Sequence, residues 1–254
     1  MHIDINCDMG ESYGAWQMGN DSHLMPFISS ANIACGFHGG DPVVIRETIL
    51  LAMNHDVVIG AHPSYPDLQG FGRRVIQMPP PEVYAHVLYQ IGALKGMVEA
   101  SGGRLHHVKP HGALYNEAAR DPDLAAAIVS AIRDVDASLI LYGLSGSELV
   151  RAARAVGLSC AEEVFADRSY RTDGSLTPRS FSGALLASAE QAAAQVLEMV
   201  LEHQVTATDG RKVQIQADTV CIHGDGQHAL SIARAVHAAL GAEGILVKPF
   251  TTTS

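Results

Sequence analysis

Four short apolar stretches of this chain each run into a histidine, and this repeated pattern limits the possible folds more than any other feature. The stretches end at His38, His62, His111 and His223, and a fifth stretch, near the N-terminus, ends at Asp8. Short apolar runs that alternate with helical patterns are typical of buried parallel strands. In α/β folds the reacting groups lie just past the carboxyl ends of such strands. The pattern therefore predicts an enzyme site built from imidazoles and carboxylates.

Strand and helix signals alternate along the whole chain, which indicates a mostly parallel sheet. The expected strands cover residues 3–7, 31–35, 57–60, 105–108, 139–142, 159–164 and 219–222. We expect one α/β domain over residues 1–254, folded as an irregular seven-stranded (β/α) barrel. The barrel is favoured because polar strand ends occur from the first strand to the last, whereas an open sheet would concentrate them near one switch point.

Helix-start signals separate these strands. Asp41 and Asp121 each precede a proline, which predicts an aspartate N-cap with proline at the first helical position. Helices are expected over about 42–54, 79–100, 122–134, 188–203 and 227–240, and another from Ser145 or Ser147 to Gly157. Two long connections, 8–29 and 165–187, are expected to be functional loops or lids.

Charge and hydropathy exclude several classes of protein. The net charge is -10, and phosphate binding needs clustered Lys and Arg, so nucleic acid is not expected as the main partner. No apolar run approaches the roughly 20 residues of a membrane span. The N-terminus lacks the basic start and apolar middle of a signal peptide. We therefore expect a cytoplasmic protein without a membrane partner.

The first strand carries polar residues at every second position, namely Asp4, Asn6 and Asp8. Period two places these side chains on one face, which is the interior in a barrel. Buried carboxylates need partners, so the pattern predicts a polar site with Asp8 as candidate base and Asn6 as a substrate contact. A surface edge strand with the apolar residues inward is the alternative.

His38 and His62 each follow a strand among small residues, which lets a ligand approach the backbone. A general acid/base role and a metal-ligand role both fit these histidines. We expect His62 to be catalytic and His38 to line the substrate site. With Asp8 they could form a site of one carboxylate and two imidazoles. A divalent metal stays uncertain, because no pair of histidines shows the helical spacing of a familiar metal motif.

Cationic residues follow two further strands. Lys109 at a strand end could hold an anion or stabilise an oxyanion, and His111 could shuttle protons. Arg73 and Arg74 lie on a glycine-rich loop, and either could clamp a carboxylate or phosphate. A surface role for this basic pair is the alternative.

Two acidic residues near later strand ends complete the candidate site. Glu162 and Glu163 end the sixth strand, and alternation sends one inward; we expect Glu163 to contact substrate. Asp225 follows the seventh strand and is either a site residue or only the N-cap of the last long helix. The chain lacks a phosphate-binding P-loop, a dinucleotide fingerprint and a nucleophile elbow, so the residues alone indicate a hydrolase or lyase without naming its substrate.

Several longer segments resemble the LamB/YcsF family over nearly the whole chain. They are residues 3–11, 30–41, 60–67, 70–74, 108–116, 163–170 and 222–225. The resemblance implies a distorted (β/α) barrel similar to carbohydrate deacetylases and glycoside hydrolases. It also implies ATP-dependent hydrolysis of the lactam 5-oxo-L-proline to L-glutamate, together with two partner subunits, B and C. ATP would then be handled mainly by these partners.

The resemblance suggests roles for the candidate residues. Asp8 or His62 would deprotonate water, while Lys109 and His111 would steady the developing charge and protonate the departing group. Two other interpretations stay open: a metal-dependent sugar or amide deacetylase, and a non-catalytic subunit that binds substrate or scaffolds its partners.

Overall fold

The computed structural model describes residues 1–186, 188–224, 226 and 228–252. Its strands are β1 (His2–Met9), β2 (Ser30–Ala34), β3 (Val58–His62), β4 (Leu105–Val108), β5 (Ile140–Leu144), β6 (Cys160–Phe165), β7 (Gln204–Thr206), β8 (Lys212–Gln214), β9 (Thr219–Ile222) and β10 (Leu246–Val247). Its helices are α1 (Asp21–Leu24), the 3-10 turn η1 (Met25–Phe27), α2 (Pro42–Asn54), α3 (Pro80–Ala100), α4 (Gly112–Ala118), α5 (Pro122–Val135), α6 (Glu148–Ala155), α7 (Ala189–Glu202) and α8 (Ala229–Ala242).

Seven parallel strands close into a barrel within the described residues. Their order is β1-β2-β3-β4-β5-β6-β9, and β9 also pairs with β1, so the sheet has no open edge. The pairing that closes the ring places Asp4 beside Thr219 and Asn6 beside Cys221. The predicted irregular seven-stranded (β/α) barrel is therefore confirmed, and the open sheet is wrong.

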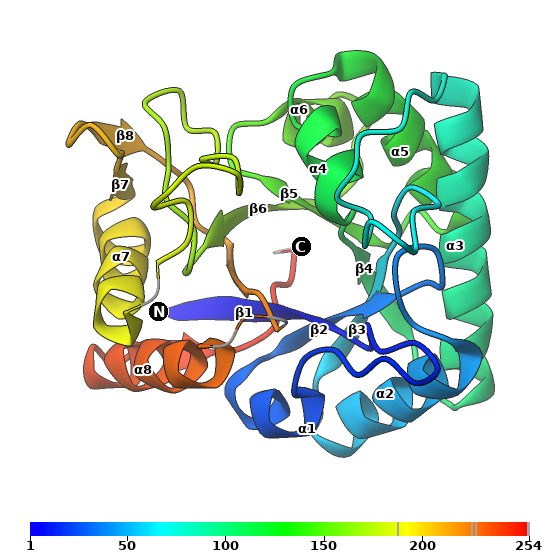
Figure 1. The fold of residues 1–254 in the computed structure, drawn as a ribbon, viewed down its shortest axis with the longest axis horizontal. Coiled ribbons are helices and arrows are strands. Elements are labelled where there is room, and N and C mark those ends of the chain that lie inside the picture. The colour runs from blue at the N-terminus through cyan, green and yellow to red at the C-terminus, as the bar shows by residue number, and fades with distance from the viewer. Residues whose placement is uncertain (187, 225, 227, 253–254) are drawn as a thin grey trace.

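The helices cover the outside of the barrel (Figure 1). Helix α3 packs against α5 on one side, and α7 packs against α8 on the other. Apolar side chains on the outer face of the strands, such as Ile5 and Cys7 of β1, are fully buried. None of the helices in the described ranges is long and apolar enough to cross a membrane.

Most helix and strand signals give the right elements. Asp41 and Asp121 cap α2 and α5 by accepting backbone N–H groups of the first turn, as predicted. Ser147 is the N-cap residue of α6, one of the two predicted starts, although its hydroxyl makes no capping hydrogen bond there. The short helices α1 and α4 and the β7–β8 hairpin were not predicted. Asp225, predicted as a site residue or N-cap, lies outside the described residues.

The polar face of β1 points into the barrel. Asp4, Asn6 and Asp8 are all buried, which excludes the surface edge strand. Asp4 accepts hydrogen bonds from Ser29 Oγ at 2.6 Å, Ser30 Oγ at 2.7 Å and Thr219 Oγ1 at 2.6 Å. This carboxylate therefore links β1, β9 and the start of β2 inside the barrel.

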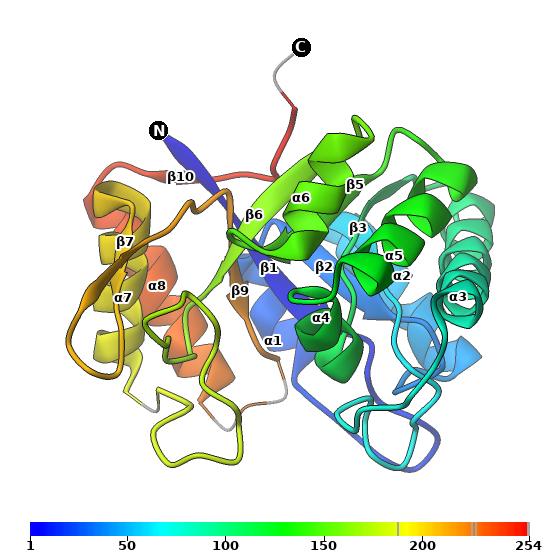
Figure 2. The ribbon, with the colours of Figure 1, turned by 90° about the horizontal axis from the view of Figure 1, so that it is seen from above.

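The carboxyl ends of the strands gather at one end of the molecule. The long loops that follow β1, β3 and β6 lie together there, opposite the N-terminus (Figure 2). Residues that directly follow different strands can therefore meet in one site.

Replacing Asp4 with Ala should destabilise the barrel strongly. The substitution leaves three buried hydroxyls without their acceptor, and hydrogen bonds to charged groups contribute about 1.5–3 kcal/mol each. We expect the free energy of unfolding, measured with urea, to fall by at least about 3 kcal/mol. Asp209→Ala, which removes an exposed carboxylate beside Arg211, should cost less than about 1 kcal/mol. Similar losses for both variants would contradict the role given to Asp4.

Candidate active site

A cavity of about 630 Å³ opens at the carboxyl ends of the barrel strands. Asp8, His62, Lys109 and His111, the four predicted catalytic residues, all line it. They come from β1, β3 and the segment between β4 and α4, and the closed barrel brings these segments together. Residues of the loop between β6 and α7 line one side of the cavity, and the functional role expected of this loop stays a prediction.

Lys109 lies at the floor of this cavity as a buried cation between acidic groups. Its Nζ is 2.9 Å from Asp8 Oδ1 and 2.9 Å from Glu163 Oε1. It also donates to Asn6 Oδ1 at 3.1 Å and lies 3.0 Å from Cys221 Sγ. One ammonium thus connects residues of β1, β6 and β9 to the end of β4.

The ion pair keeps its members charged. Burial alone would lower the pKa of Lys109, but Asp8, Cys221 and Glu163 together raise it well above its usual value. Burial likewise favours the protonated form of Asp8, yet His62 and Lys109 outweigh it and hold the pKa of this carboxyl well below its usual value. Lys109 is therefore an ammonium and Asp8 a carboxylate at neutral pH.

Glu163 is the inward member of the glutamate pair, as alternation predicts. It is fully buried and accepts a hydrogen bond from the Tyr115 hydroxyl at 2.6 Å. Glu162 instead pairs with Arg154 on the outer side of β6. Asn6 and Glu163 contact Lys109 from beneath the cavity, so their roles as substrate contacts remain predictions.

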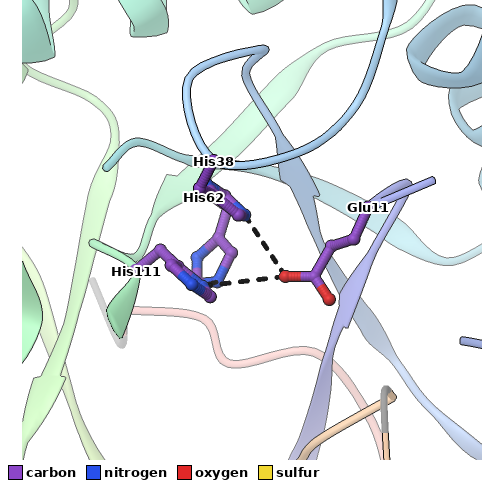
Figure 3. A group of neighbouring side chains, drawn as sticks. All are labelled: Glu11, His38, His62 and His111. Carbon is purple, nitrogen blue, oxygen red and sulfur yellow. Dashed lines mark hydrogen bonds and ion pairs between the residues drawn. The ribbon is translucent and has the colours of Figure 1, made fainter. Parts of the chain in front are cut away.

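Three histidines and a glutamate converge beside the Lys109 pair (Figure 3). His62 Nε2 and His111 Nδ1 are 2.9 Å apart, and Glu11 Oε1 is 3.6 Å from His111 Nδ1. Glu11 Oε1 is also 3.2 Å from His38 Nε2. Burial and neighbouring imidazoles lower the pKa of both His38 and His111 well below the usual value. The structure thus adds Glu11 and His111 to the two histidines predicted as metal ligands.

Asp8 belongs to a different group from the one predicted for it. Its Oδ1 lies 3.4 Å from His62 Nε2, but its other close ligand-type neighbours are Cys221 and His223. Lys109 contacts both Asp8 and Cys221, so a positive charge already occupies this second group. A metal ion is therefore better suited to the group around Glu11 than to the group around Asp8.

The two predicted clamp arginines behave differently. Arg73 lines the cavity, and its guanidinium lies 4.9 Å from the Phe71 ring centroid. Arg74 forms an ion pair with the buried Asp67 and is itself largely exposed. Of the two, Arg73 is therefore placed to meet a substrate, whereas Arg74 stabilises the loop.

Arg168 and Arg179, on the loop after β6, also line the cavity. Arg168 is buried and donates to the Thr177 carbonyl at 2.6 Å. Burial, with the nearby charge of Arg179, lowers the pKa of Arg168 to about 10, so it stays charged at neutral pH. Both arginines fall in the segment predicted as a lid, but they were given no role there. Their positive charge, in a long loop after a strand end, was the sequence signal that could have identified them as site residues.

The fold and the cavity together define the class of protein. It is a parallel (β/α) barrel with an enzyme-type site at the carboxyl ends of its strands, built from a buried lysine, carboxylates and histidines.

The chain belongs to the LamB/YcsF family, whose model matches residues 3–254. A Bordetella pertussis protein named as the A subunit of 5-oxoprolinase is 58% identical over 246 residues, which cover 97% of this chain and 98% of the relative. The solved "Lactam Utilization Protein" of Thermus thermophilus is 50% identical, with a TM-score of 0.93 and coverage of 98% and 100%. A family 4 carbohydrate esterase of Streptomyces lividans shares the fold, with a TM-score of 0.50 at 10% identity and coverage of 98% and 93%. The predicted family and the deacetylase-like barrel are both confirmed.

Replacing Lys109 with Met should be costly, because it leaves Asp8 and Glu163 buried without their cation. Removing one partner of a buried pair costs about 3–5 kcal/mol. Lys95→Met, which breaks a helical surface pair with Glu99, should change stability far less. Urea unfolding of both variants measures the difference, and a loss below about 1 kcal/mol for Lys109→Met would contradict the charge assignment.

Proposed function

We propose that this chain is the lactam-hydrolysing component of an ATP-dependent 5-oxoprolinase, which converts 5-oxo-L-proline to L-glutamate. The names of two relatives, one a 5-oxoprolinase component and the other a lactam utilization protein, support the substrate class. The observation that carries the proposal is the buried Lys109–Asp8 pair at the floor of a cavity that also contains arginines. Such a cavity suits a small anionic cyclic amide.

The arginines would hold the acidic end of the substrate. A 5-oxoproline molecule carries one carboxylate beside its lactam ring. Arg168 and Arg179 present guanidinium groups on the loop side of the cavity, and planar guanidinium groups bind carboxylates and phosphates through paired hydrogen bonds. The lactam ring would then lie between this loop and the floor.

The floor residues would carry the hydrolysis. A lactam resists water because attack at its carbonyl breaks amide resonance. Asp8, held as a carboxylate, would accept the proton of the attacking water. Lys109 would stabilise the negative charge that develops on the oxygens bound to the lactam carbon, through a preorganised ammonium that needs no reorientation.

ATP would activate the lactam by phosphorylating its carbonyl oxygen. After water adds to the lactam carbon, the C–N bond would break and the ring nitrogen would take the proton that Asp8 accepted. A second water would then release phosphate from the resulting acyl phosphate and leave L-glutamate. We assign the phosphorylation mainly to partner subunits B and C, because the chain lacks a P-loop sequence. The relatives are named as one lettered component of 5-oxoprolinase, which supports a multi-subunit assembly. The chain would receive the activated lactam from its partners.

The direct test measures 5-oxoproline turnover with ATP, using this chain alone and the chain assembled with subunits B and C. We expect turnover only in the assembly. Asp8→Asn should lower kcat by at least about 100-fold, within the range that general-base catalysis contributes. His55→Gln, an exposed change at the end of α2, serves as the control and should leave kcat unchanged. Wild-type turnover by an assembled Asp8→Asn variant would contradict the proposed base.

Arg168→Lys should weaken substrate binding more than it slows the chemical step. The lysine keeps the charge but loses the paired hydrogen bonds of the guanidinium. We expect KM for 5-oxoproline to rise about tenfold, the change that corresponds to about 1.4 kcal/mol. Arg211→Lys, at an exposed site, is the matched control. An unchanged KM would remove Arg168 from the carboxylate site.

A second candidate function is metal-dependent deacetylation of a sugar or amide, and the group around Glu11 favours it. Acetate release from acetylated sugars by the isolated chain, abolished by a chelator, would support this activity. The 5-oxoproline assay on the same preparation separates the two functions.

A further inference from the structure

His62 Nε2 and His111 Nδ1 face one another, and a hydrogen bond between two neutral imidazole rings does not explain this contact. His62 Nδ1 is 2.6 Å from the Lys109 carbonyl, and His111 Nε2 is 2.9 Å from the Phe71 carbonyl. A carbonyl oxygen only accepts, so these two nitrogens carry the ring hydrogens. The remaining nitrogens, His62 Nε2 and His111 Nδ1, each present a lone pair at a separation of 2.9 Å. Two lone pairs at this distance repel, so the arrangement calls for an additional proton or a cation between them.

The surrounding groups favour a metal cation over a proton. A proton on His62 Nε2 would serve His111 Nδ1 and Asp8 Oδ1, which lies 3.4 Å away, but it would not account for Glu11 and His38. One atom each of Glu11, His38, His62 and His111 lies within 4.8 Å of all the others. All four residues are buried. Three imidazoles and a carboxylate form a donor set suited to zinc and related first-row ions. Two nitrogens bound to one tetrahedral zinc ion at about 2.0–2.1 Å lie about 3.3 Å apart. The 2.9 Å between His62 Nε2 and His111 Nδ1 would therefore widen by a few tenths of an ångström when the ion binds.

The histidine rings are held in place by the groups around them. Histidine ligands of metals typically donate their other ring hydrogen to a carbonyl or carboxylate, as His62 and His111 do. His38 stacks on His111 with ring centroids 3.8 Å apart. Gly72 makes this packing possible, since a Cβ there would lie 2.3 Å from Ser64 Oγ and 2.7 Å from His111 Cδ2. The donor atoms are thus positioned before any ion binds.

We propose that Glu11, His38, His62 and His111 form a binding site for one divalent first-row transition-metal ion, with zinc as the preferred occupant. Figure 3 shows the four side chains turned toward a common point. His62 and His111 also line the cavity, so the site adjoins the space where a substrate would bind. A bound ion would polarise a carbonyl or acidify a water molecule there. Metal binding itself does not depend on the proposed lactam chemistry.

The test measures metal binding by the intact chain, without an activity assay. Protein stripped with a chelator is titrated with Zn²⁺ by calorimetry, and bound metal is counted by mass spectrometry after dialysis. We expect one zinc ion per chain and a higher Tm for the zinc-loaded protein, because a ligand that binds only the folded state stabilises it. Co²⁺ bound to the wild-type chain should show the visible absorption of a tetrahedral site with nitrogen ligands, which needs no variant that could misfold.

Variants connect the bound ion to the four residues. Glu11→Gln and His38→Gln should each weaken zinc binding by more than about tenfold, the loss that outer-sphere partners alone can cause. His55→Gln, which removes an exposed histidine, should bind zinc like the wild type. Binding below one ion per chain, a Co²⁺ spectrum without nitrogen ligation, or wild-type affinity in both site variants would overturn the proposal.

Discussion

The residues at the cavity floor are linked by their contacts with the buried ammonium of Lys109. An isolated charge inside a barrel is very unfavourable, and it is tolerated only when opposite charges and hydrogen-bond acceptors surround it. Asp8 and Glu163 supply the opposite charges at 2.9 Å each, and Asn6 supplies a further acceptor. Because these groups come from separate strands, the ammonium position requires the barrel to be closed in the observed register. The same closure places Asp8 at the cavity floor.

Beside the Lys109–Asp8 pair lies the group of four donor side chains, which contains no lysine: Glu11, His38, His62 and His111. His62 connects the two, since its Nε2 is 3.4 Å from Asp8 Oδ1 and 2.9 Å from His111 Nδ1. The cavity floor therefore combines a fixed ammonium–carboxylate pair with the adjoining group that we propose binds a cation. A water molecule or a carbonyl oxygen placed between them would meet a base on one side and an electrophile on the other. This division of charge suits the hydrolysis of an unreactive amide.

The barrel and much of its floor could be predicted from the sequence for identifiable physical reasons. Period-two polarity places Asp4, Asn6 and Asp8 inside, and strand ends locate His62 and Lys109. Glu11 was missed as a candidate because its position depends on contact between two loops: a Cβ on Gly39 would lie 2.7 Å from the Glu11 carbonyl oxygen. Periodicity carries no information about such contacts. Arg74 differs from Arg73 because it forms an ion pair with Asp67. Asp67 lies seven residues from Arg74 around a turn, and no strand or helix pattern reveals that pairing.

In the proposed complex the cavity holds the lactam with its acidic end on the arginines and its carbonyl on the floor. A crystal structure of the chain with 5-oxo-L-proline would decide whether the substrate binds in this way. We expect the substrate carboxylate to contact Arg168 and Arg179, and the lactam carbonyl to face Lys109 and Asp8. Substrate bound outside this cavity, or bound with the carboxylate on Lys109 and the ring directed away from Asp8, would show that the proposed arrangement is wrong.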